Sequence, residues 1–69
     1  MRYISERTES MKQKILKKSK DLFGDVSIEL HWSHERNCWW IKVTIDKNDI
    51  IEYNVITTEN NDIDFKVIW

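Results

Sequence analysis

The chain has 69 residues, of which 41% are hydrophobic and 33% are charged, and its formal net charge is −1. A chain of this length makes one small domain that buries only about 60% of its unfolded surface. The hydrophobic fraction excludes a disordered chain, and the charge excludes one embedded in a membrane. The charge is segregated, because residues 1–24 carry seven basic and three acidic side chains, whereas residues 25–69 carry four basic and nine acidic ones. Such asymmetry bears on the choice of partner more than on the fold.

The sequence shows no pattern for export or membrane insertion. No apolar run approaches the roughly 20 residues of a membrane-spanning helix, and the first residues, 1–4, do not form the apolar stretch of a secretory signal. Cys38 is the only cysteine, so it cannot form an internal disulfide, which favours a reducing intracellular setting. We therefore expect a cytoplasmic protein of a bacterium or of a phage-infected host cell.

The first predicted element is a helix over residues 5–23. Apolar and small side chains recur at three- and four-residue steps from Ile4 to Leu22, which is the spacing of one helix face. Ser5 is the expected N-cap, and Gly24 can adopt the left-handed conformation that ends a helix. The helix also carries five lysines, three of them near its C-terminal end: Lys12, Lys14, Lys17, Lys18 and Lys20.

Four strands are predicted after the helix, over residues 25–33, 38–46, 50–58 and 62–69. Apolar and polar side chains alternate in each of them, as in a sheet with one buried face. Short loops rich in turn-forming residues join the strands, which favours antiparallel hairpins. The expected registers pair three sets of residues: Ser33 with Cys38, Asp46 with Ile50, and Thr58 with Asp62.

These registers gather the apolar side chains of all four strands on an inner face, against the helix. Val43 and Phe65 should be buried there, whereas Lys42 and Asn54 should face solvent. A one-residue slip would move a whole apolar set to the other face. The predicted fold class is α+β, with one N-terminal helix packed on a four-stranded antiparallel meander in a single two-layer domain over residues 1–69. The N-terminal end of the helix should cover the row that contains Trp32.

This order of elements resembles the cystatin-like layout, in which a helix packs on an antiparallel meander. The inhibitory Gln-x-Val-x-Gly loop of that family is absent from the chain. No residue roles are therefore carried over from that family.

His31, His34 and Cys38 carry groups that ligate zinc, at close spacing. Structural zinc sites usually have four ligands, and a second ligand pair is missing, so a polar hairpin with an incidental thiol is the favoured interpretation. A catalytic cysteine needs a lowered pKa and a shaped pocket. The carboxylate pairs lie in predicted turns, where aspartate is favoured for backbone reasons. We expect no metal, no cofactor and no enzymatic activity.

The helix lysines Lys14, Lys17 and Lys20 are candidate phosphate contacts. Base readout would need Arg, Asn or Gln side chains facing a groove, and single-strand binding would need exposed aromatic rings beside the lysines. The predicted helix face offers little of either, and the sheet is acidic. The lysines are therefore interpreted as a solvated face, and nucleic-acid binding is kept as an alternative.

A protein-binding surface is predicted on the outer face of the sheet. The expected registers place Trp40 beside Ile56, inside a polar rim. Tryptophan is enriched at binding hot spots, and an apolar centre with a polar rim is the usual anatomy of an interface. The uncovered edge of the last strand offers a second route, through pairing with another chain. The predicted binding residues are Trp40, Ile56, His31, Asp64, Glu52 and Ile68.

The predicted function is that of a small non-enzymatic inhibitor that occupies a surface of a larger protein. In size and composition, the chain is similar to the inhibitors made by phages and mobile elements of AT-rich bacteria, including anti-CRISPR and other anti-defence proteins. That resemblance implies a partner that handles nucleic acid, whose channel the acidic sheet could occupy. The alternatives are a nucleic-acid-binding regulator and a homo-oligomeric protein joined through edge strands or the Trp40 face.

Overall fold

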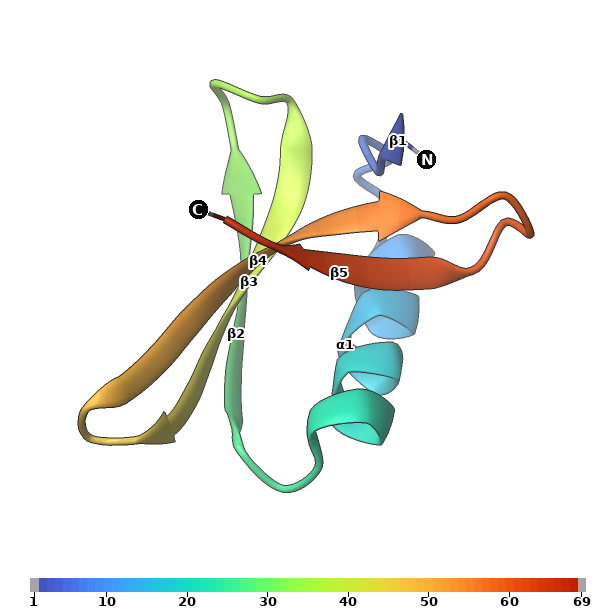
Figure 1. Ribbon diagram of the computed structural model, residues 1–69. Helices are drawn as coiled ribbons and strands as arrows, with labels where there is room; N and C mark the ends of the chain where they lie inside the picture. Colours follow the sequence, from blue (N-terminus) through green and yellow to red (C-terminus); the bar gives the residue numbers. More distant parts are fainter. Residues whose placement is uncertain (1, 69) are drawn as a thin grey trace.

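The computed structural model describes residues 2–68. These residues form one helix and one five-stranded antiparallel sheet (Figure 1). The elements in chain order are β1 (Arg2–Tyr3), α1 (Glu9–Phe23), β2 (Ser27–Ser33), β3 (Cys38–Asp46), β4 (Asp49–Thr57) and β5 (Ile63–Val67). The predicted α+β class, with a helix packed on an antiparallel meander, is confirmed. Within the described residues, no helix has the length and apolar character needed to cross a bilayer.

Two of the three predicted hairpin registers are confirmed. In the β2–β3 hairpin, Ser33 lies opposite Cys38 and Trp32 opposite Trp39. In the β4–β5 hairpin, Val55 lies opposite Phe65. The loop of this second hairpin is closed by a backbone hydrogen bond of 2.9 Å between Thr58 and Asp62. The apolar pattern and the turn residues therefore decide these pairings together.

The predicted β3–β4 register is wrong. In the body of the hairpin, Val43 lies opposite Ile51, two residues away from the Tyr53 that the predicted register implies. Next to the turn, Asp46 pairs with Asp49 instead of Ile50, and a bulge between Thr44 and Asp46 absorbs the difference. The turn is therefore two residues long, and the Asp46 carboxylate accepts a hydrogen bond of 3.0 Å from the Asn48 backbone N–H. Because side chains alternate with a period of two, the two-residue shift over Trp40–Thr44 keeps these side chains on their predicted faces and changes only their neighbours across the strands.

The N-terminal residues join the sheet instead of the helix. Ile56 and Thr57 of β4 pair with both β1 and β5, so β1 lies on the same side of β4 as β3. At this end β3 and β4 diverge, and Ile4 bridges them. Its N–H donates to the Val55 carbonyl at 3.2 Å, and its carbonyl accepts from the Trp39 N–H at 3.1 Å. The side chain of Ile4 is buried in the core.

The helix consequently begins four residues later than predicted. Thr8, not Ser5, is the N-cap, and its hydroxyl accepts a hydrogen bond of 3.1 Å from the Met11 N–H. Burial of Ile4 between two strands outweighs continuation of the helical stripe. The C-terminal end is as predicted, because Gly24 has a φ of +80° and its N–H bonds to the Lys20 carbonyl.

The helix bridges the two outermost strands of a strongly twisted sheet (Figure 1). It contacts β2 on one side and β5 on the other. Ile15 points into the core, and Phe23 packs 5.0 Å from Tyr53 and 5.6 Å from Phe65, measured between ring centroids. The core consists of Ile4, Ile15, Trp39, Ile41, Val43 and Val55.

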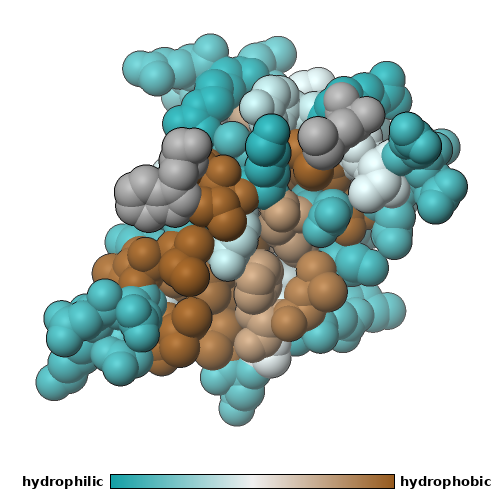
Figure 2. Space-filling view, in the orientation of Figure 1, coloured by the Kyte–Doolittle hydropathy of each residue, from teal (hydrophilic) through white to brown (hydrophobic). Residues whose placement is uncertain are grey.

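One end of the sheet is left largely uncovered. Figure 2 shows apolar side chains gathered over the sheet toward the β3–β4 turn, with the polar turn beyond them. Ile45 is 55% exposed there. We call this surface the apolar end; it comprises Leu22, Val26, Ile45, Ile51 and Val67. Trp69, the last residue of the fourth predicted strand, lies outside the described residues.

We predict that Thr8→Ala lowers the free energy of unfolding by about 1 kcal/mol, because it removes the hydroxyl that caps α1. Ser5→Ala is the matched control and should change stability by less than about 0.5 kcal/mol, since Ser5 is exposed and outside the helix. Urea denaturation of both variants measures the difference. Equal losses at the two positions would contradict the observed start of the helix.

Candidate protein-binding groove

The structure separates the two residues at the centre of the predicted outer-face surface. Trp40 lies opposite Asn54, not Ile56, because of the β3–β4 register. The Trp40 ring is half-buried and stacks on His31, with ring centroids 4.5 Å apart. Ile56 is only 4% exposed and lies between Tyr3 of β1 and Asp64 of β5. The predicted pair of exposed apolar side chains is therefore not formed.

Other outer-face residues are also placed differently from expectation. Asn54, predicted to face solvent, is only 6% exposed, because the Arg36 guanidinium donates a hydrogen bond of 2.7 Å to its side-chain oxygen. Glu52 and Asp64 are exposed, as a polar rim requires. Ile68 is half-buried, and its N–H bonds to the Glu52 carbonyl. The binding role of this face stays a prediction.

The candidate zinc ligands are not brought together. Cys38 is fully buried, His31 stacks on Trp40, and His34 is exposed in the β2–β3 turn. Among residues 2–68, no group of three or more His, Cys, Asp or Glu side chains is arranged to hold a metal ion. Burial raises the pKa of the Cys38 thiol above its ordinary value of 9.0, and the nearby charge of Arg36 offsets part of this effect.

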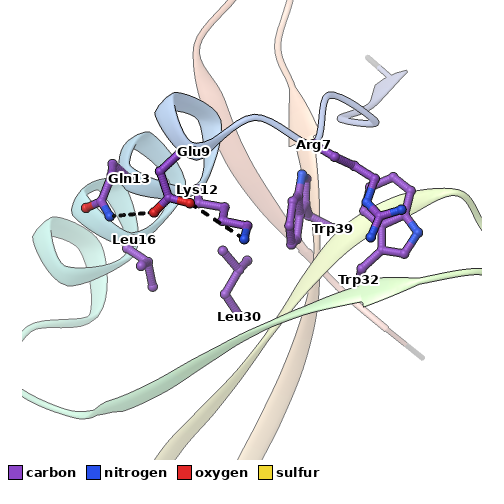
Figure 3. Close-up of a pocket in the computed structure, with 8 residues that line it drawn as sticks. All are labelled: Arg7, Glu9, Lys12, Gln13, Leu16, Leu30, Trp32 and Trp39. Carbon is purple, nitrogen blue, oxygen red and sulfur yellow. Dashed lines mark hydrogen bonds and ion pairs between the residues drawn. The ribbon is translucent and has the colours of Figure 1, made fainter.

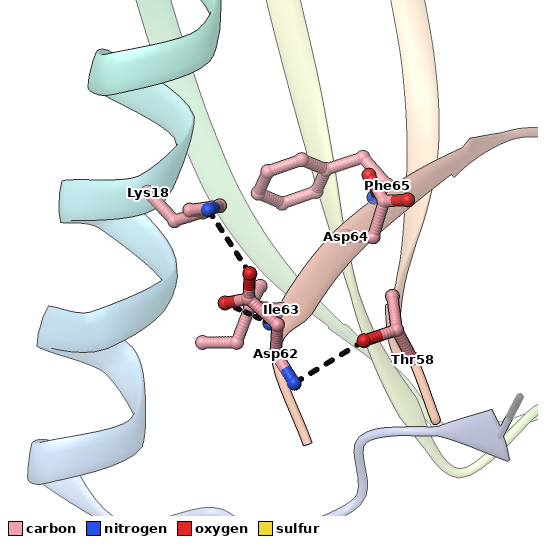
Figure 4. A network of polar contacts seen from close by, with 6 residues as sticks. All are labelled: Lys18, Thr58, Asp62, Ile63, Asp64 and Phe65. Carbon is pink, nitrogen blue, oxygen red and sulfur yellow. Dashed lines mark hydrogen bonds and ion pairs between the residues drawn. The ribbon is translucent and has the colours of Figure 1, made fainter. Parts of the chain in front are cut away.

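Of the three candidate phosphate-binding lysines, Lys14 and Lys17 lie on the side of α1 that faces the β4–β5 turn, whereas Lys20 is exposed near the C-terminal end of the helix. Lys14, Lys17 and Lys18 line a shallow hollow with Asp62. The Lys18 ammonium lies 3.4 Å from the Asp62 carboxylate (Figure 4). The backbone N–H of Asp62 donates a hydrogen bond to the Thr58 hydroxyl. These lysines therefore share their surface with a carboxylate. The nearest tryptophans belong to a different surface.

A groove of about 710 Å³ lies between the N-terminal half of α1 and strand β2 (Figure 3). Leu16 from the helix and Leu30 from β2 point toward one another across it, and Trp32 and Trp39 close one end. Polar side chains of the helix form the rim. The residues that line this tryptophan groove are Arg7, Glu9, Lys12, Gln13, Leu16, Leu30, Trp32 and Trp39.

The tryptophans and the cations of the groove are in direct contact. Trp32 meets Trp39 edge to face, with centroids 5.2 Å apart. The guanidinium carbon of Arg7 lies 4.6 Å from the Trp32 ring centroid, and the Lys12 ammonium lies 5.9 Å from that of Trp39. Both distances are within the range of cation–π attraction. The groove thus combines an aromatic wall with positive charge.

Local structure explains how these side chains are held. The Trp39 indole N–H donates a hydrogen bond of 2.7 Å to the Glu6 carbonyl, which fixes the segment that carries Arg7 over the sheet. The Trp32 row is therefore covered mainly by the extended residues that precede α1, not by the helix itself as predicted, although Lys12 of the helix lies near the Trp39 ring. On the rim, the Glu9 carboxylate lies 3.7 Å from Lys12 and accepts a hydrogen bond of 3.4 Å from Gln13. The rim is ordered by its own polar contacts.

Strand β2 is both one wall of the groove and the last strand of the sheet. It pairs with β3 over all seven of its residues, and within residues 2–68 no strand pairs with its other edge. An unpaired edge presents backbone N–H and carbonyl groups that can bond to another chain. A groove beside such an edge is a recurrent arrangement for peptide recognition.

Sequence reasoning did not identify Arg7 or Lys12 as partners of the tryptophans. The prediction placed Arg7 inside a helix, where its direction is fixed by helical spacing. One feature of the sequence could have pointed to these contacts. The N-terminal end of the helix was expected to lie near the Trp32 row, and this brings the cations of residues 2–12 toward two tryptophans.

Comparison with known proteins does not assign this chain to a family. No family model matches it, and no curated protein or solved structure gives a match. Functional inference therefore depends on the geometry of the surfaces.

We predict that the free energy of unfolding falls as pH rises above about 9, because folded Cys38 holds its proton more tightly than the unfolded thiol. At lower pH both states are protonated and the effect vanishes. Urea denaturation of the wild type and of Cys38→Ala, at neutral pH and above 9, measures it. The variant should lose less stability than the wild type on going to high pH; parallel losses would contradict the prediction.

Proposed function

We propose that this chain is a small non-enzymatic protein-binding domain that inhibits a larger protein by occupying its surface through the tryptophan groove. The observation that carries the proposal is the contact of Arg7 with Trp32 in a groove beside the unpaired edge of β2. Arginine and tryptophan are the residue types most enriched at binding hot spots. Here both are accessible to a partner, since Arg7 is exposed and Trp32 is half-buried.

The groove supports protein binding better than the outer face does. On the outer face, the Trp40 ring is stacked on His31, and Ile56 is covered by neighbouring strands. In the groove, apolar side chains from α1 and β2 lie at the bottom and charged groups lie at the rim. This is the arrangement of an apolar centre within a polar border that protein interfaces use.

We further propose that the inhibited partner handles nucleic acid, as the resemblance in size and composition to phage and mobile-element inhibitors implies. The excess of nine acidic over four basic side chains in residues 25–69 supports this choice. Glu29, Glu52 and Asp64 are exposed on the outer face, which also carries Lys42, between the two glutamates, and Lys66. A domain anchored through its groove would present these carboxylates to cations that otherwise contact phosphates.

Affinity capture from a lysate of the native host, quantified by mass spectrometry, tests the binding surface. We predict that a partner retained by the wild type is lost with Trp32→Ala, as expected when an anchor worth about 2 kcal/mol or more is removed. Trp40→Ala is the matched control, since it truncates the same residue type on the opposite face. Circular dichroism checks that both variants fold.

The two variants give distinct outcomes. Loss of the partner with Trp40→Ala alone would overturn the groove and support the outer face. If both folded variants retain the partner, neither the groove nor the outer face is the binding surface. With a purified partner, inhibition should be complete at equal molar amounts of the two proteins. Full effect at a small fraction of that amount would indicate turnover and contradict a non-enzymatic mode of action.

Self-association is a second candidate function, and the apolar end favours it. Leu22, Ile45 and Val67 are all more than 40% exposed at this end of the sheet. Contiguous apolar surfaces on small proteins mark interaction sites. A second copy could cover this surface without touching the tryptophan groove, so the two candidate functions are compatible.

Sedimentation equilibrium tests self-association. If the apolar end joins two copies, the wild type should form a dimer that Ile45→Lys converts to monomer, because the new charge would be buried in the interface. Tyr3→Lys is the control, since Tyr3 is also exposed and apolar but lies in β1. A monomeric wild type at high concentration would exclude this candidate.

A further inference from the structure

The proposed function leaves open which part of a partner enters the groove. Strand β2 offers an unpaired edge of seven residues. A segment that adds to this edge must be extended, and its alternate side chains must point toward the inner face of the sheet. On that face, β2 presents Leu30 and Trp32, two residues apart. The added segment would therefore meet these two positions with every second side chain.

The surroundings of Leu30 and Trp32 differ in charge. At Leu30, the opposite wall of the groove is Leu16, so the surroundings are apolar. At Trp32, the Arg7 guanidinium covers the ring at 4.6 Å. Arg7 forms no ion pair with another described residue, whereas Lys12 lies near Glu9. A guanidinium beside an aromatic ring can still bind a carboxylate in the plane of its N–H groups.

We propose that the tryptophan groove binds an extended acidic segment of a partner protein, added as a strand to the free edge of β2. An acidic side chain of this segment lies opposite Trp32 and pairs with Arg7. An apolar side chain two residues away lies opposite Leu30 and packs against Leu16. This inference rests on the proposed function and names the chemistry of the ligand.

Nucleic acid fits the same groove less well. Stacking of a base on Trp32 would require displacement of Arg7, and Trp39 is buried. The other helix lysines that could follow a phosphate backbone, Lys14 and Lys17, line the separate hollow near Asp62. Single-stranded nucleic acid is therefore an outcome of the test and not the proposal.

The test uses the full chain and two labelled peptides of about seven residues, matched to the length of β2. The first peptide has the sequence Thr-Leu-Thr-Glu-Thr-Leu-Thr. The second is identical except that lysine replaces the glutamate. Fluorescence anisotropy at low salt should show that the glutamate peptide binds at least about tenfold more tightly than the lysine peptide. Amide chemical shifts should change along β2, and its edge amides should gain protection from exchange.

Arg7→Glu should reverse the preference, so that the lysine peptide binds more tightly. Lys17→Glu makes the same change in net charge on the far side of α1 and should leave the preference intact. Both residues are exposed, so both variants should fold like the wild type. Equal binding of the two peptides, equal effects of the two variants, or shift changes confined to β5 would overturn the proposal.

Tighter binding of an oligothymidylate than of the glutamate peptide, with shifts at Trp32, would overturn it in favour of nucleic acid. Failure of both peptides to bind overturns the acidic-strand proposal alone if the host partner is still lost with Trp32→Ala. If that variant retains the partner as well, the proposed function fails with it.

Discussion

The structure depends on the insertion of Ile4 between β3 and β4. These strands pair up to Trp40 and Asn54 and then diverge, so their next backbone groups need another partner. Ile4 satisfies both strands, donating to Val55 and accepting from Trp39, and its side chain fills the core between them. In a domain this small, where the margin of stability is a few kcal/mol, such a contact can decide where the helix begins.

The binding groove follows from that insertion. Ile4 fixes residues 2–4 as extended chain, so residues 5–8 must cross the sheet before α1 begins at Glu9. The crossing places the Glu6 carbonyl on the Trp39 indole and the Arg7 guanidinium over Trp32. If the helix began at Ser5, Arg7 would lie on its first turn. The contact of cation and aromatic ring is therefore a product of sheet pairing at the N-terminus.

A single helix cannot cover a sheet that twists this strongly. Because α1 bridges β2 and β5, it buries the middle of the inner face and leaves space at both ends. Toward the β3–β4 turn, the result is the exposed apolar end; toward Trp32, it is the groove, closed partly by polar residues of the helix. Both surfaces offered for partners are thus consequences of packing one short helix against a curved sheet.

The sequence by itself determined the helix and the four strands that follow it, the faces of those strands and two of the three registers, because alternation with a period of two and the turn residues act locally. Tertiary structure decided the rest. The two-residue turn at Asp46–Asp49 arose from a bulge that no pattern marks, and it separated Trp40 from Ile56. The start of the helix and the position of Arg7 were set by burial of Ile4 among strands distant in sequence. Helical periodicity cannot reveal such a contact, since its energy comes from partners that only the folded sheet provides.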